Sequence, residues 1–201
     1  MYLTLILGLI AAALLPAADA HMSREEREKA IRWLNESRTE FLQLVQDLSD
    51  EQWKWKPAPE RWSVGEVAEH ILLSEGALFG RVREALANPP NPDWEKKTAG
   101  KAEFLEKVMP SRVRRAQAPE EIQPRGNLTR AEIMSRYAEV REKSLRFIEE
   151  TQASLKDHTV EHPFPVFNTL NAYQWFIYIP LHNMRHDKQI EEVKATPGFP
   201  K

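Results

Sequence analysis

Apolar residues recur every three to four positions in four long segments of the chain, which is the spacing of one buried face of a helix. The first three of these segments each follow a hydroxyl residue that has a glutamate three positions later: Ser23 with Glu26, Ser63 with Glu66, and Thr129 with Glu132. Such a pair forms a capping box, in which the two side chains bind backbone N–H groups at a helix start. The pattern therefore predicts three helices that begin at these positions.

A fourth helix is predicted from about Thr169 to about Lys194, with Pro180 inside it. Proline lacks an N–H group, so we expect a free carbonyl and a kink at that point. The second and third helices are separated by residues 88–128, a stretch with six prolines. This length lets the chain cross the bundle instead of making a tight hairpin, and residues 101–108 within it are predicted to form a short additional helix.

Four long amphipathic helices in one chain favour an all-α fold, a four-helix bundle with a long crossover between helices two and three. We expect a single domain over residues 21–201, since no repeat or Gly-rich phosphate loop interrupts it. Only residues 162–167 have any character of a strand. Trp53 and Trp55 are expected to anchor the connection between the first two helices against the bundle.

The composition narrows the possible chemistry. The 201 residues include 28 Lys and Arg against 30 Asp and Glu, a net charge of −2, so the chain has no overall electrostatic signature of a nucleic-acid partner. The one basic cluster, Arg112 to Arg115, is interpreted as a solvated face of the crossover. There is no cysteine, which excludes disulfides and thiolate metal sites, so the six histidines must carry any soft-metal chemistry.

The N-terminal segment predicts export. Residues 1–18 carry no charge, and Ala18-Asp19-Ala20 fits a signal-peptidase cleavage site. We therefore expect residues 1–20 to be a signal peptide and the protein to be secreted or periplasmic, with no membrane contact beyond that segment. The alternatives are an uncleaved N-terminal membrane anchor and a true start at Met22.

Histidine spacing indicates a metal site. His182 and His186 lie four residues apart, so both imidazoles share one face of the fourth helix and can bind one ion. If the second and fourth helices are neighbours, His70 can complete a three-histidine site with open positions for water or substrate. The alternative is a set of ordinary buried histidines. His158 and His162 have the same spacing, but Pro163 follows at once, so this pair is interpreted as part of a loop.

Several other side chains are candidates for the surroundings of that site. Trp62, Trp175 and Tyr178 could line a pocket, although aromatic residues at this spacing more often belong to a bundle core. Ser74, one turn after His70, could bind water or substrate, or could be a small residue at a helix contact. Gln189 could orient a histidine ligand, or could be solvated. Glu69 is a candidate general base.

Two motifs resemble one known family. The segment from Leu48 to His70, with Trp53, Trp55, Pro57, Pro59 and Trp62, is similar to the second-helix signature of the DinB/YfiT-like metalloenzyme family. The segment His182-x-x-Arg185-His186-x-x-Gln189-Ile190 resembles its last-helix signature. The resemblance implies a down-up-up-down four-helix bundle. It also implies one divalent metal ion, nickel or zinc with manganese as a further option, held by His70, His182 and His186.

The same resemblance implies a metal-dependent enzyme acting on a small molecule that the sequence does not define. Some relatives use low-molecular-weight thiols as co-substrates, but export would separate this chain from a cytoplasmic thiol pool. Hydrolysis by a metal-activated water is therefore favoured over thiol-dependent S-transfer. Two alternatives stay open: a non-catalytic bundle that binds a metal or a small ligand, and a purely structural or interaction bundle. Homodimer formation through helix faces is compatible with any of these.

Overall fold

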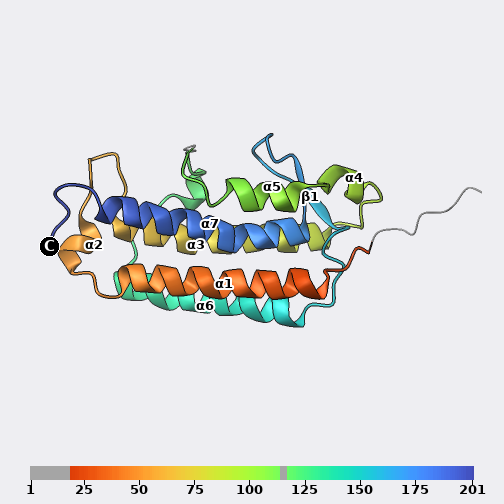
Figure 1. Cartoon of the computed structure of the whole chain (residues 1–201), viewed down its shortest axis with the longest axis horizontal. Helices are drawn as coiled ribbons and strands as arrows, with labels where there is room; N and C mark the ends of the chain where they lie inside the picture. Colours follow the sequence, from red (N-terminus) through yellow and green to blue (C-terminus); the bar gives the residue numbers. More distant parts are fainter. Residues whose placement is uncertain (1–18, 114–116) are drawn as a thin grey trace, which may run out of the picture.

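The computed structural model describes residues 19–113 and 117–201, and its four long helices form a bundle (Figure 1). These helices are α1 (Arg24–Val45), α3 (Val64–Ala87), α6 (Arg130–Glu150) and α7 (Ala172–Lys194). Helices α1 and α7 run in one direction and α3 and α6 in the other, as Figure 1 shows. The expected all-α bundle with down-up-up-down connectivity is therefore confirmed.

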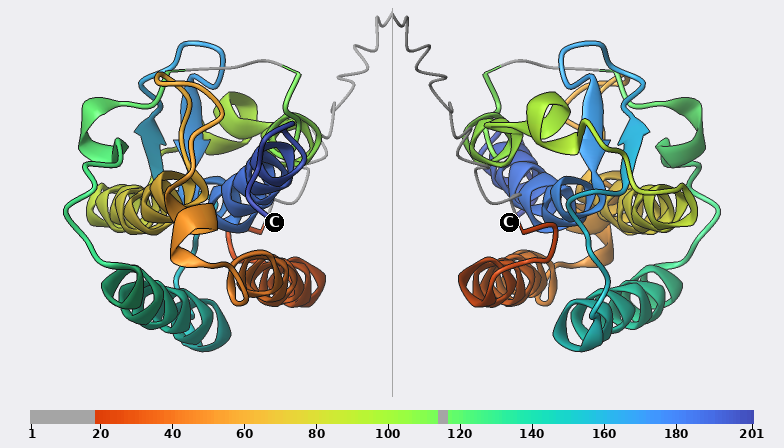
Figure 2. Two further views of the ribbon diagram at one scale, coloured as in Figure 1. Left: turned by 90° about the vertical axis from the view of Figure 1, so that its left-hand side faces the viewer. Right: turned by 90° about the vertical axis from the view of Figure 1, so that its right-hand side faces the viewer.

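Each long helix packs against two others. Helix α7 lies against α1 and α3, and α6 lies against the same two helices on the opposite side (Figure 2). The second and fourth long helices, α3 and α7, share the most extensive contact of the bundle. The condition under which His70 could approach His182 and His186 is therefore met.

Among the residues that the structure describes, five helices begin with a capping box, namely the four long helices and the short helix that starts at Asp50. The boxes at Ser23, Ser63 and Thr129 begin α1, α3 and α6 where the sequence predicts them. The predicted start of the last helix near Thr169 is wrong, because Asn171 caps α7 and the helix begins at Ala172. Its box is formed by an amide pair, since the Gln174 N–H donates to Asn171 Oδ1 at 2.8 Å and the Asn171 N–H donates to Gln174 Oε1 at 3.1 Å.

A short hairpin precedes α7. Strand β1 (Thr159–Glu161) pairs antiparallel with β2 (Thr169–Asn171), with Val160 opposite Leu170. Residues 162–167, the stretch whose sequence is ambiguous between strand and loop, belong to the loop that connects the two strands. Pro163 and Pro165 account for the loop, because neither can donate a ladder hydrogen bond.

The long crossover runs back along the bundle, as predicted. It contains α4 (Trp94–Thr98), α5 (Lys101–Val108) and the 3₁₀ turn η1 (Glu120–Ile122), and α5 has the bounds that the sequence predicts. The solvated interpretation of the basic cluster is wrong for Arg112, whose Nη2 lies 2.9 Å from Glu192 Oε2 on α7. Arg114 and Arg115 of that cluster lie outside the described residues.

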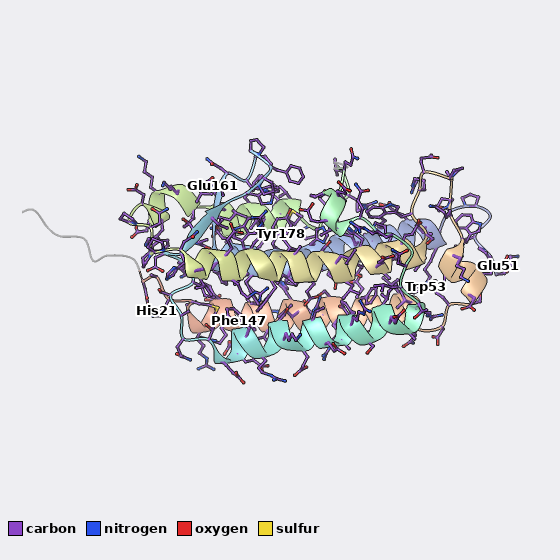
Figure 3. The ribbon with its side chains drawn as sticks, turned by 180° about the vertical axis from the view of Figure 1, so that it is seen from behind. His21, Glu51, Trp53, Phe147, Glu161 and Tyr178 are labelled. Carbon is purple, nitrogen blue, oxygen red and sulfur yellow. The ribbon has the colours of Figure 1, made fainter. Side chains whose placement is uncertain are left out.

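The first connection contains a short helix, α2 (Asp50–Lys54), whose Trp53 covers the start of α3. Trp53 is 7% exposed, and a Cβ atom on Gly65 would lie only 2.4 Å from its Nε1. Only glycine fits at that point of α3. Trp55 packs edge-on against Phe199 with ring centroids 5.5 Å apart, so the predicted anchoring by both tryptophans is confirmed. Figure 3 shows Trp53 at one end of the molecule and Glu161 near the other.

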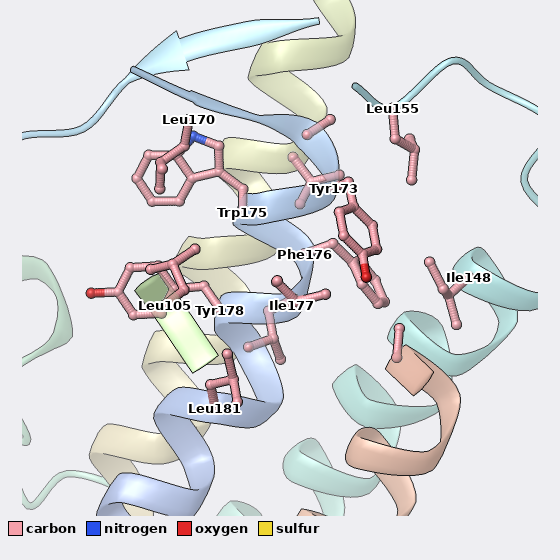
Figure 4. Close-up of a cluster of buried hydrophobic side chains, with 14 of the residues drawn as sticks. Leu105, Ile148, Leu155, Leu170, Tyr173, Trp175, Phe176, Ile177, Tyr178 and Leu181 are labelled. Carbon is pink, nitrogen blue, oxygen red and sulfur yellow. The ribbon is translucent and has the colours of Figure 1, made fainter. Parts of the chain in front are cut away.

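The core on α7 is divided between two sides of the helix. In Figure 4, Tyr173, Phe176 and Ile177 point toward the neighbouring helices of the bundle, while Trp175 and Tyr178 point the other way. Most side chains of the first half of α7 are buried, because the hairpin and α5 cover the side that the bundle leaves open.

The predicted signal peptide covers residues 1–20, and residues 1–18 lie outside the described part of the chain. The signal peptide therefore stays a prediction. Within residues 19–113 and 117–201, no helix has both the length and the apolar character needed to cross a membrane.

Candidate metal centre

Three histidines from two helices meet at the contact between α3 and α7. His70 extends from α3, and His182 and His186 extend from adjacent turns of α7. Each offers one ring nitrogen such that the three atoms all lie within 4.8 Å of one another. Their ring centroids are 4.4–5.1 Å apart. The structure thus brings together the three residues that the sequence selects.

Hydrogen bonds on the outer side of two rings fix where their protons lie. His70 Nδ1 is 2.7 Å from the Ile122 carbonyl oxygen, which can only accept, so Nδ1 carries the proton. His186 Nδ1 is 2.8 Å from Gln189 Oε1, and Arg112 Nη1 donates to the same oxygen at 3.1 Å. Since this oxygen accepts from both neighbours, His186 also carries its proton on Nδ1.

The other ring nitrogen, Nε2, therefore carries no proton in either His70 or His186. His70 Nε2 and His186 Nε2 face each other at 3.2 Å, and each presents a lone pair. Two acceptors at this distance cannot hydrogen-bond to one another. Two nitrogens bound to one tetrahedral zinc ion at ~2.0–2.1 Å would lie about 3.3 Å apart, close to the spacing found here. The residues present therefore fit a divalent metal ion.

Electrostatics keep these rings neutral. Burial lowers the pKa of His70 to about 4, despite its bond to the Ile122 carbonyl. The pKa of His186 lies well below its ordinary value because of burial and the neighbouring histidines. Burial, His70 and Arg185 lower the pKa of His182 in the same direction. Neutral imidazole is the form that binds a metal, so the site is preset for coordination.

The three rings differ in their access to solvent. His70 and His186 are 1% and 6% exposed, whereas His182 is half-buried.

Four of the five predicted surrounding residues lie at this centre. The Trp62 ring is 4.8 Å from the His70 ring, and the Tyr178 ring is 6.0 Å from the His182 ring. Ser74 Oγ is 3.4 Å from His70 Nε2. Gln189 Oε1 lies 2.8 Å from His186 Nδ1 and accepts its proton, so this contact orients the His186 ring.

Trp175 belongs to a neighbouring aromatic group. Its ring stacks on His162 at 4.7 Å and lies 6.0 Å from Tyr178, one turn before His182. The second histidine pair is divided, because His158 Nδ1 binds the Asn88 carbonyl oxygen at 2.7 Å while His162 Nδ1 accepts the Phe164 N–H at 2.9 Å. Both members of that pair thus have partners away from the centre.

Glu69 has a different environment from the one expected of a general base. Its carboxylate is 4% exposed and accepts two backbone N–H groups of the crossover, from Arg125 at 3.1 Å and Gly126 at 2.9 Å. Both of its oxygens are thus engaged with the crossover. The general-base interpretation of Glu69 is not supported by this geometry.

A second buried polar cluster lies beside the histidines, and sequence reasoning missed it. We call it the Arg141 network; its members are Ser37, Glu75, Tyr137, Arg141, Ser144, Asn183 and Asp187. The Arg141 guanidinium binds the Glu75 carboxylate at 2.9–3.1 Å and Asn183 Oδ1 at 2.8 Å.

The remaining bonds of the Arg141 network reach all four long helices. Arg141 donates to Ser37 Oγ at 2.8 Å, and Ser144 donates to Glu75 at the same distance. Asn183 Nδ2 donates to both oxygens of Asp187 at 2.9 Å. A sequence signal did exist, because Arg141 falls on the same stripe of α6 as the apolar Tyr137 and Ile148.

Comparison with known proteins gives three matches. The model of the DinB superfamily matches residues 34–190. YuaE, an uncharacterised protein of Bacillus subtilis (strain 168), is 31% identical over 163 residues, which cover 80% of this chain and 94% of YuaE. The structure of YfiT from Bacillus subtilis, described as a probable metal-dependent hydrolase with an unusual four-helix bundle topology, aligns with a TM-score of 0.59 at 18% identity. That alignment covers 89% of this chain and 91% of YfiT.

Proposed function

The chain belongs to the DinB superfamily, and on that premise we propose that it is a metal-dependent hydrolase whose ion is held by His70, His182 and His186. One observation carries the proposal: the 3.2 Å contact between His70 Nε2 and His186 Nε2, in two rings whose Nδ1 atoms each face an accepting oxygen. A set of ordinary buried histidines would place a donor opposite an acceptor at such a contact.

The donor set narrows the choice of metal. Three neutral imidazoles and no carboxylate form the candidate ligand group, which suits nickel or zinc better than magnesium or calcium. Manganese remains a further candidate. Three protein ligands leave at least one coordination position for a water or a substrate.

When bound, such an ion would supply Lewis acidity, which polarises a substrate group and lowers the pKa of a water. The protein contributes orientation. Gln189 and the Ile122 carbonyl keep the protons of His186 and His70 on Nδ1, so each Nε2 points into the centre as a lone pair. Trp62 and Tyr178 contact the His70 and His182 rings and restrict water on those sides.

The predicted export of the chain supports hydrolysis over thiol transfer. A secreted or periplasmic protein would not meet a cytoplasmic thiol pool, whereas water is available in every compartment. A small ester, amide or phosphoester is therefore the proposed class of substrate.

Elemental analysis of residues 21–201 tests the proposal. We expect about one equivalent of nickel, zinc or manganese, lost in the double variant His182→Ala/His186→Ala. His158→Ala is the matched control, because His158 has its partner in the Asn88 carbonyl and should leave the metal content unchanged. No metal in the wild-type chain after reconstitution would overturn the proposal.

A substrate panel then separates the possible functions. Metal-dependent turnover of an ester, amide or phosphoester supports the hydrolase. Turnover only with an added thiol would replace it with the transferase. Stoichiometric metal without turnover on either panel would replace it with a non-catalytic binding bundle.

A further inference from the structure

We propose that Glu69 is a positioning residue, which holds the crossover against α3 so that the Ile122 carbonyl fixes the tautomer of His70. The purpose of this arrangement rests on the proposed function, since it prepares one ligand of the candidate metal centre. The arrangement itself is a property of the metal-free chain and can be measured there.

The carboxylate of Glu69 is unusually well buried for a charged group. Glu69 is 4% exposed, and burying a carboxylate is costly unless strong hydrogen bonds compensate. The bonds it forms are to the Arg125 and Gly126 N–H groups. Consecutive backbone N–H groups that converge on one anion form a nest, which requires one residue in the left-handed region. Gly126 meets this requirement with a φ of 67°.

Glu69 and its neighbour His70 hold the same short stretch of chain. Glu69 binds the crossover at residues 125 and 126, and His70 donates to it at Ile122, only four residues earlier. The carbonyl that orients the imidazole is therefore tethered to α3 by a carboxylate on the adjacent residue. Gln123 closes this stretch on its other side by donating to the Ala118 carbonyl at 2.9 Å.

The position of the Ile122 carbonyl decides between two states of the histidines. With the carbonyl in place, the His70 proton lies on Nδ1, and Nε2 is free to bind an ion. If the carbonyl moves away, the proton can shift to Nε2 and donate to His186 Nε2, 3.2 Å distant. That second state is a satisfied histidine pair that excludes a metal. By holding the crossover, Glu69 selects the first state.

The decisive measurement is which ring nitrogen of His70 carries the proton. Nitrogen-15 NMR of the imidazole in metal-free protein should show a proton on Nδ1 in the wild type and a shift toward Nε2–H in Glu69→Ala. Glu69→Gln keeps one acceptor oxygen, so we expect an intermediate population, and it serves if Glu69→Ala does not fold. The matched control is Glu132→Gln, which removes a carboxylate that accepts the Thr129 N–H at 2.9 Å on a helix without candidate ligands.

Cobalt(II) binding gives a second readout. We expect Glu69→Ala to bind cobalt about 10–100-fold more weakly than the wild type, with altered visible absorption, as is usual when the support of a ligand is removed. Glu132→Gln should match the wild type in both. An unchanged His70 tautomer in both Glu69 variants would overturn the inference. A wild type that shows the Nδ1 tautomer but binds no metal would instead overturn the proposed function and leave the positioning role standing.

Discussion

The candidate metal centre and the Arg141 network are adjacent polar clusters with opposite hydrogen-bonding character. They alternate on α7, where His182 precedes Asn183 and His186 precedes Asp187, and every member of both clusters is buried except His182, which is half-buried. In the Arg141 network the donors meet acceptors: the guanidinium meets carboxylate and amide oxygens, the Ser144 hydroxyl meets the Glu75 carboxylate, and the Tyr137 hydroxyl donates to Asn183 Oδ1 at 2.8 Å. In the metal centre the outer nitrogens are satisfied and the inner ones face each other as acceptors.

This difference shows what distinguishes a binding site from a structural polar core. Burial and polarity are common to both clusters, so neither property identifies a ligand site. A closed set of donors and acceptors needs no outside partner, because its buried polar groups bond to one another within the protein. In the histidine cluster the two facing lone pairs have no donor between them, and a cation from outside would complete the pair.

The largest change in folding stability is expected when the Arg141 network is broken. Arg141→Ala leaves the Glu75 carboxylate buried without its cation, so the free energy of unfolding should fall by about 3–5 kcal/mol. Urea denaturation of metal-free protein measures this change. The control is Arg146→Ala, since the pair of Arg146 with Glu142 is exposed and spans 3.9 Å; we expect a loss of no more than about 0.5 kcal/mol. A small loss in Arg141→Ala would mean that the network is not closed as described.

Metal binding at the candidate metal centre should raise the free energy of unfolding, by less than the Arg141→Ala substitution lowers it. At a free metal concentration of about 100 times the dissociation constant, the wild type should gain roughly 2.7 kcal/mol of stability. His186→Ala should lose this gain, because it removes one of the two facing nitrogens. Thermal unfolding with and without zinc or nickel measures both. An equal gain in the variant would place the ion elsewhere.

A weaker effect is expected from the orientation of one ligand. Gln189→Ala removes the acceptor of the His186 proton, so metal affinity should fall about tenfold or somewhat more. Gln189→Glu keeps an acceptor oxygen and should restore most of the affinity. Competition with a chromophoric chelator can measure the metal dissociation constants of the wild type and the two variants. If Gln189→Glu binds as weakly as Gln189→Ala, the contact does not act through this hydrogen bond.

The smallest effect is a loss of folding stability in acid. It arises at His162, which stacks on Trp175 outside the metal centre. Burial and Arg81 lower the pKa of His162 to about 4, below its ordinary value of 6.5. The unfolded chain therefore binds the proton more readily, and stability should be lost as pH falls from 6.5 toward 4. Because His162 is only partly buried, solvent screening reduces the loss to about 1 kcal/mol.

His162→Phe tests that assignment, since phenylalanine can stack on Trp175 without taking up a proton. The variant should lose less stability than the wild type between pH 6.5 and pH 4 in urea denaturation. The same acid dependence in both proteins would assign it to other groups.

Local signals predicted the helices well where the capping chemistry was explicit. Ser23, Ser63 and Thr129 each marked a helix start, because a hydroxyl and a glutamate three residues on leave few alternatives. The start of α7 was misplaced because its cap is the amide pair of Asn171 and Gln174. The hairpin was missed because strands of three residues carry no periodicity, and their pairing depends on the surrounding fold.

At the candidate site, the sequence predicted which side chains meet but not which backbone groups they bind. The spacing of His182 and His186 could be read directly, and His70 followed from one assumption about neighbouring helices. The partner of His70 could not be predicted, because a backbone carbonyl such as that of Ile122 has no signature in the sequence. The Arg141 network required knowing that a charged residue on an apolar stripe would find Glu75 on another helix.

The candidate ligands lie far apart in the sequence, so a bound ion would also affect the stability of the fold. His70 and His186 are 116 residues apart, so an ion bound to both would act as a reversible cross-link in a chain without cysteine. A covalent link that closes a loop of about 100 residues removes entropy from the unfolded ensemble worth up to ~4.7 kcal/mol. Unlike a disulfide, such an ion would leave the chain on unfolding, so it would stabilise the folded state by mass action, and chelation, instead of reduction, would open the loop.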